Sequence, residues 1–169
     1  MSDLQLEEFF VQKLSVVWIE HTEAENDSTQ TVNTGFDYEI ALAKEDSRRR
    51  RMILRIKFSQ ISAEKAEIGY QIGAEIAGYL RIDPSDNPEK DEVRFRVNGV
   101  SFLYGALRGL VAVVTGSFPG GKFNIPTILP FDVVKAVEER RAKSLQSSAQ
   151  GSNEPSKPES GRRQSAQGG

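Results

Sequence analysis

The residue types that most often carry out catalysis are nearly absent from this sequence. The chain contains one histidine, His21, and no cysteine. A Ser-His-Asp triad needs a histidine as its base, and most catalytic zinc sites need histidine or cysteine ligands. His21 follows an apolar run at the start of a polar segment, which is typical of a surface residue at the end of a strand. Acidic residues are plentiful but scattered, so we expect neither an enzyme nor a bound cofactor or metal.

A run of four arginines, Arg48 to Arg51, is the most concentrated charge in the chain. Such a run could contact an anion, an acidic partner or a nucleic acid. It could equally be the solvated end of a hairpin. The formal net charge is −2 and the pI is about 5.6, whereas nucleic-acid-binding domains are usually basic. We therefore favour the hairpin end over nucleic-acid binding.

The bulk properties are those of a globular chain. Its 169 residues suffice for one domain with a sizeable core. The first residues, MSDLQLEEFF, are acidic where a signal peptide would be basic. The longest apolar stretch, around Val100 to Val114, is too short to span a bilayer and contains Arg108. Because a cysteine-free chain is compatible with a reducing compartment, we expect a cytoplasmic protein.

Residues 117–132, SFPGGKFNIPTILPFD, combine large apolar side chains with three prolines and a Gly-Gly pair. This composition rules out a long helix or a central strand. The segment is either a loop that seals the core or an apolar surface intended for another chain.

Four strands are expected before this segment, over residues 9–22, 36–46, 52–61 and 63–82. The second alternates with period two, so that Phe36, Tyr38, Ile40 and Leu42 share one face. The glycines of the fourth strand predict bends rather than a phosphate-binding loop.

Helices are expected over the second half of the chain. Pro88 opens a short helix to about residue 97 that Asn98-Gly99 can stop, although alternation leaves a strand possible there. Residues 100–116 form a helix that is apolar nearly all round, and 131–145 form another. The predicted fold is α+β, a four-stranded antiparallel meander with the helices on one face. The predicted domains are a flexible N-terminus (1–8), a folded domain (9–143) and a disordered tail (144–169).

The sequence resembles the SecB export-chaperone family over about residues 9 to 140. The most specific stretch is FLYGALRGLVAVVTGSFPGGKFNIPTILPFDVVKAVEE, residues 102–139. The family has an aromatic-rich helix that carries an arginine, then a glycine, a Phe-Pro pair, an Asn/Pro-containing crossover and a last helix opened by Phe-Asp. The matching residues here are Arg108, Gly116, Phe118-Pro119, Asn124-Ile125-Pro126 and Phe131-Asp132.

The resemblance implies an ATP-independent holdase that assembles as a dimer of dimers, binds unfolded or precursor polypeptides in an apolar groove, and serves protein export with the SecA motor. A related branch guards an antitoxin in toxin–antitoxin–chaperone systems, and this is the alternative. Apolar burial is non-directional, which suits promiscuous binding. Carried across by motif, the client-groove residues are Tyr38, Ile40, Leu42, Phe123, Ile125, Ile128, Phe131 and Val134.

The apolar helix has more apolar surface than one sheet face can cover, which predicts a homotetramer. Its small-residue spacing lets another backbone approach closely, so the expected oligomer interface comprises Leu103, Gly105, Leu107 and Gly109. On the groove assignment, Phe123→Asp with Ile125→Asp should abolish client binding and leave the fold intact.

One departure from the family bears on the motor. The export branch carries acidic residues on the outer face of the sheet, whereas Trp18 and Thr22 stand at the matching place on the first strand. Export and dedicated antitoxin chaperoning therefore both remain open.

Overall fold

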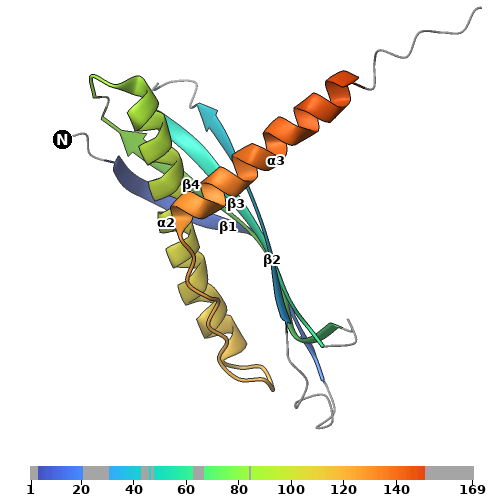
Figure 1. Ribbon diagram of the computed structural model, residues 1–169. Helices are drawn as coiled ribbons and strands as arrows, with labels where there is room; N and C mark the ends of the chain where they lie inside the picture. The colour runs from blue at the N-terminus through green and yellow to red at the C-terminus, as the bar shows by residue number, and fades with distance from the viewer. Residues whose placement is uncertain are drawn as a thin grey trace, which may run out of the picture. The chain divides into compact units, whose positions relative to one another are not determined.

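The computed structural model describes residues 4–20, 31–42, 46, 48–62, 67–83 and 85–150. His21 and residues 151–169 of the expected tail lie outside the described residues. Four strands precede two helices along the chain (Figure 1). Their bounds are β1 (Leu4–Ile19), β2 (Thr31–Leu42), β3 (Arg49–Ile61), β4 (Glu67–Ile82), α2 (Pro88–Thr115) and α3 (Pro130–Gln150).

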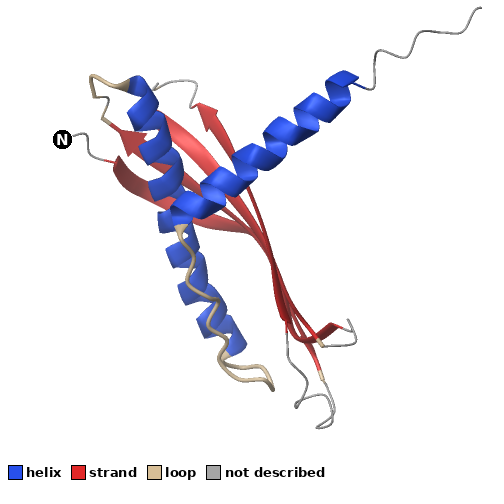
Figure 2. Cartoon of the chain, in the orientation of Figure 1, coloured by secondary structure: helices blue, strands red, loops and turns tan. Residues whose placement is uncertain are grey.

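The strands form one antiparallel sheet in the order β1-β4-β3-β2, and α2 lies against it (Figure 2). This confirms the α+β prediction. The strands β2, β3 and β4 follow one another as a meander, as expected. The first strand does not, because β1 pairs with β4 and leaves β1 and β2 as the two edges.

The hydrophobic core lies between the sheet and α2. One row across the inner face joins Tyr38, Leu54 and Ile76, which face one another in the strand register and are all fully buried. From α2, Leu103, Leu107 and Val111 pack into the same cluster. The alternation read from the sequence of β2 and β3 therefore does correspond to one covered face.

The N-terminal segment is not the flexible arm that the sequence predicted. Strand β1 begins at Leu4, and Leu4 and Leu6 face Ile82 and Leu80 of β4. The acidic residues Glu7 and Glu8 follow them in the same strand. Register shifts between Leu6 and Glu8, and again between Val11 and Lys13, mark irregularities of the kind that bulges produce in an edge strand.

A single 28-residue helix replaces the two that were predicted before the crossover. It starts where expected, with the Asn87 side chain accepting a hydrogen bond from Lys90 N and Pro88 in its first turn. Asn98-Gly99 does not end it. A Cβ at Gly99 would lie 2.7 Å from Cε of Met52, so this glycine lets the helix approach β3 closely.

The bend expected in β4 is found at one glycine. Gly69 has a φ of 60°, and the pairing with β3 shifts between Ser59 and Gln60 at this point. The Gln60 side-chain oxygen accepts a hydrogen bond of 2.7 Å from Tyr70 N. Gly69 thus allows a bulge that a residue with a Cβ would strain.

The chain divides into two compact units, Met1–Val137 and Glu138–Gly169. The described part of the second unit is helical to Gln150, so the boundary expected at residue 144 is wrong. Within it, Arg141 pairs with Glu138.

Helix α2 is long and apolar enough to meet the length and composition criteria for a membrane span. The sequence predicts no span, because the apolar stretch around Val100 to Val114 is shorter than the whole helix and contains Arg108. One face of α2 is buried on the sheet, and core helices of soluble proteins meet the same criteria.

Candidate functional site

The segment between the two helices, residues 116–129, is termed the crossover. The Phe123 amide donates a 2.8 Å hydrogen bond to Oγ1 of Thr115, at the end of α2. The Tyr104 hydroxyl, three turns earlier, donates to the carbonyl of Pro126 at 2.6 Å. The crossover therefore runs back along α2 toward its middle (Figure 2).

Its first half, taken here as residues 116–126, is bound to the sheet through aromatic rings. We define the aromatic cluster as Trp18, Phe58 and Tyr70 of the sheet with Phe118 and Phe123 of the crossover. The Phe123 ring lies 4.9 Å from that of Phe58 and 5.1 Å from that of Tyr70, between centroids. The centroid of the Tyr70 ring lies 4.8 Å from that of Trp18 and 6.2 Å from that of Phe118. Such spacings are typical of favourable ring pairs.

The Tyr70 hydroxyl anchors the crossover as well. It donates to the carbonyl of Gly121 and lies 3.3 Å from that of Thr115. Burial raises the pKa of the Tyr70 hydroxyl, as burial also does for Tyr104. Both hydroxyls therefore keep their protons at neutral pH and remain hydrogen-bond donors to the crossover backbone.

Several residues expected to face a client are instead enclosed within their own chain. Ile125 and Tyr38 are each 1% exposed, and Val134 is buried. Phe123 is half-buried beneath its ring contacts. Because the crossover lies on the inner face of the sheet, its first half seals the core. Of the two alternatives predicted for this segment, the loop that seals the core therefore holds for its first half. The assignment of Ile125, Tyr38 and Val134 to a client groove is corrected, because all three side chains are buried.

The second half of the crossover is open to solvent. Leu129 is 69% exposed and Phe131 58% exposed, while Ile128 is half-buried. We term these three residues the exposed strip. The carbonyl of Leu129 accepts from the amides of Asp132 and Val133 at 3.0 and 3.2 Å, so the start of α3 fixes the strip. Leu129 was not selected from the sequence, although it belongs to the same ILPF run.

Two further groove residues lie on β2. Leu42 is 67% exposed at the end of the strand, and Ile40 is half-buried against the core. Of the eight expected client residues, the structure therefore leaves Leu42 and Phe131 largely open, and Ile40, Ile128 and Phe123 partly so.

The residues expected at the oligomer interface divide between two faces of α2. Leu103 and Leu107 are fully buried against the sheet, which corrects their assignment. Gly105 and Gly109 are exposed, with open space where a Cβ would stand. They belong to a row at helical spacing, termed the α2 stripe, which comprises Phe102, Gly105, Gly109, Leu110 and Val113 and in which Leu110 is half-buried.

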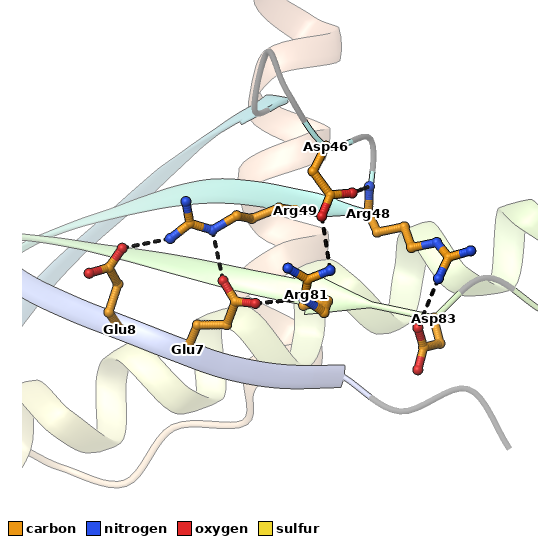
Figure 3. Close-up of polar contacts among 7 residues, drawn as sticks. All are labelled: Glu7, Glu8, Asp46, Arg48, Arg49, Arg81 and Asp83. Carbon is orange, nitrogen blue, oxygen red and sulfur yellow. Dashed lines mark hydrogen bonds and ion pairs between the residues drawn. The ribbon is translucent and has the colours of Figure 1, made fainter.

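The first two arginines of the run, Arg48 and Arg49, are paired within the chain (Figure 3). Arg49 contacts Glu7 at 2.7 Å and Glu8 at 2.6 Å. Glu7 also accepts from Arg81 at 2.6 Å, so one carboxylate bridges two strands. Arg48 lies 3.9 Å from Asp83.

The other two arginines have partners as well. Arg50 pairs with Glu92 of α2 and lies over the Phe95 ring, 5.1 Å from its centroid. Arg51 lies over the Phe10 ring. Residues 49–51 are thus part of β3 rather than a solvated hairpin end. Their internal partners do not favour an anion or nucleic-acid site.

This charge network predicts acid sensitivity. Hydrogen bonds from Arg81 and Arg49 lower the pKa of the Glu7 carboxyl, and the Arg48 amide lowers that of Asp46. A carboxyl whose pKa is lower in the folded state stabilises the fold at every pH above its pKa in the unfolded chain, which is about 4.5 for glutamate. This stabilisation is lost as the pH falls through the pKa of the folded state.

We therefore expect Glu7→Gln to lower the unfolding midpoint at pH 7, and the difference from wild type to shrink as the pH falls below about 4.5. Urea denaturation across this range measures it. Because the groups are exposed, 1 M salt should shrink the difference. If the difference in unfolding midpoint between wild type and Glu7→Gln were as large at pH 3 as at pH 7, the charge of Glu7 would not be its cause.

Comparison with solved structures places this arrangement in a known fold. The SecB-like chaperone of Mycobacterium tuberculosis, solved in complex with a ChAD peptide from the HigA1 antitoxin, matches with a TM-score of 0.57 and 12% identity, over 74% of this chain and 90% of that one. A Streptococcus agalactiae protein of unknown function matches with a TM-score of 0.48 and 18% identity, over 75% of this chain and 99% of that one. No family model and no curated protein matches the chain.

The fold is therefore SecB-like, a four-stranded antiparallel sheet with two helices. The sequence resemblance to that class is confirmed at the level of fold.

Proposed function

We propose that this protein is an ATP-independent holdase chaperone that binds non-native polypeptides on the exposed strip and on Leu42 of β2. The observation that carries the proposal is the exposure of Leu129 and Phe131 at a fixed helix start. Large apolar side chains that are held in water are stabilised when foreign apolar surface covers them. Such burial is not directional, so many client sequences fit.

The test is suppression of aggregation. A chemically unfolded client is diluted into buffer with and without the purified protein, in the absence of nucleotide, and light scattering is followed. The proposal expects scattering to fall in proportion to the protein added, at low and at high salt alike. Full aggregation at a molar excess of the protein would contradict it.

A dedicated antitoxin chaperone is a second candidate, and the outer face of the sheet favours it over export. The acidic side chains there have cationic partners in the same sheet. Arg55 contacts Glu39 and Glu75 at 2.7 Å each, and Glu7 is held by two arginines. Paired carboxylates attract a basic partner less than free ones do.

The similar Mycobacterium tuberculosis chaperone was solved with an antitoxin peptide, which also supports this second candidate. Pull-down of the native protein from its own cells separates the two roles. A dedicated chaperone should retain one small partner and no SecA, whereas an export chaperone should retain many precursors and SecA.

We further propose that the protein is a homotetramer in which the α2 stripe packs against a second copy. Replacing Phe102 and Val113 with glutamate should place charges in that contact and shift the protein from tetramers to smaller species, to dimers where the second interface of a dimer of dimers persists and otherwise to the 18.8 kDa monomer. Sedimentation velocity measures the shift. Leu145→Glu, at an equally exposed leucine in the second unit, is the matched control. A wild-type monomer at every concentration would remove this proposal.

A further inference from the structure

The second half of α2 and the crossover carry charges of one sign only. The sequence has no acidic residue from position 93 to position 131. Two cations of this range lie near the start of α2, where carboxylates of the same helix pair with them. The other two are Arg108 of α2 and Lys122 of the crossover. The face that these two elements form is therefore basic, although the whole chain has a formal net charge of −2.

Arg108 lies on the side of α2 that contacts the crossover. It follows Tyr104 by four residues and precedes Thr115 by seven, and both spacings place side chains on one side of a helix. Tyr104 and Thr115 both form hydrogen bonds with the crossover backbone. Burial raises the pKa of the Tyr104 hydroxyl and the Arg108 charge opposes this rise, so the guanidinium lies near that hydroxyl.

Neither cation is neutralised by a carboxylate. Among the residues that the structure describes, no ion pair involves Arg108 or Lys122. Arg108 is half-buried, and Lys122 is exposed. The one carboxylate at the start of α3, Asp132, is matched by one cation, Lys135. A cation without a partner attracts a carboxylate more strongly than a paired one does, and more strongly beside apolar surface than in open water.

A client that covers the exposed strip reaches both cations if it continues along the crossover. The crossover contacts α2 at Tyr104 and again at Thr115, and Arg108 lies between these two contacts. The two contacts are eleven residues apart in the helix, which is about 16 Å along its axis. An extended client chain covers this distance in about five residues.

We propose that this face selects clients in which acidic residues lie within about five positions of the apolar residues that cover the exposed strip. The inference rests on the proposed holdase function and adds the class of client segment. Arg108 and Lys122 then lie beside client carboxylates, whereas a client with lysine or arginine at those positions meets charges of its own sign. The two cations determine specificity, and apolar burial supplies the affinity.

Three fluorescein-labelled synthetic peptides test the proposal on the wild-type protein. Each has the apolar core Leu-Phe-Ile-Leu, flanked on both sides by glutamates, by lysines or by glutamines, and binding is measured by fluorescence polarisation at low salt. We expect the glutamate peptide to bind about tenfold more tightly than the lysine peptide, with the glutamine peptide between them. Because salt screens exposed charges, about 0.5 M salt should remove this ratio and leave the glutamine peptide bound.

Variants assign the preference to the two cations. Arg108→Gln with Lys122→Gln should bind the glutamate and lysine peptides equally, and the glutamine peptide as wild type does. The matched control is Lys13→Gln with Lys57→Gln, which removes two exposed cations from the outer face of the sheet and should keep the ratio. If the first variant does not fold, Lys122→Glu, at an exposed position, replaces it and should lower the ratio.

Equal binding of the glutamate and lysine peptides by wild type would overturn the charge preference. A wild-type ratio in the folded Arg108/Lys122 variant, or in Lys122→Glu, would overturn the assignment to these residues. In both cases, binding of the glutamine peptide would leave the proposed function standing. If none of the three peptides binds to wild type, the proposed function and the preference that rests on it both fail.

Discussion

Replacing Leu129 and Phe131 with serine is expected to remove most client binding and to leave the fold intact. Both side chains are more than half exposed, so the folded protein loses little when they are shortened. A client that buries them gains about 1.5–3 kcal/mol from each. Their joint loss should weaken binding on the order of a hundredfold, measured as the protein concentration that halves client aggregation.

The matched control is Val32→Ser with Leu145→Ser, which removes two exposed apolar side chains that are not part of the strip. This control should suppress aggregation as well as wild type does. Equal losses in the two double variants would mean that general surface hydrophobicity, and not the strip, binds clients.

Phe123→Asp with Ile125→Asp is expected to unfold the protein, the opposite of what the sequence predicted. Ile125 is enclosed, and an unpaired carboxylate in such a site costs several kcal/mol. Domains are stable by only about 5–15 kcal/mol. Ile125→Ala alone should cost about 2–5 kcal/mol, as measured by urea denaturation.

The comparison variant is Leu129→Asp, a charge on the same segment at an exposed position. It should unfold at the same urea concentration as wild type. A cooperative, wild-type transition in the Phe123/Ile125 double variant would show that the first half of the crossover does not seal the core.

The sequence was sufficient where one physical rule decides the structure. The second and third strands alternate because only one of their faces is covered, so period two identifies Tyr38, Leu54 and Phe58 as inward-facing. The start of α2 was predictable for the same kind of reason, since Asn87 and Pro88 act locally on the first turn.

The sequence predictions were wrong where residues far apart in the chain determine the local structure. Glu7 lies in a strand because Arg49 and Arg81 meet it there, and no local pattern reveals those partners. Asn98-Gly99 has the composition of a helix stop, yet Gly99 lies inside the helix, where its missing Cβ leaves room for the end of the Met52 side chain. Local rules do not distinguish a glycine that ends a helix from one that lets it pack closely.

The sequence predicted which segment carries the candidate site, but not which residues of that segment are exposed. The crossover was singled out for large apolar side chains in an irregular segment, which holds for both of its halves. Which half is covered depends on Phe58 and Tyr70, more than fifty residues earlier in the chain, and on the Tyr104 hydroxyl. Composition treats Ile125 and Leu129 alike, and only their tertiary surroundings separate them.

Site-specific photo-crosslinking tests the central proposal most directly. A benzophenone amino acid replaces Leu129 in one sample and Val32 in another, and each is irradiated with an unfolded client. Client adducts at position 129 with few at position 32 are the predicted result. Equal labelling at the two positions, or none at position 129, would contradict client binding on the exposed strip.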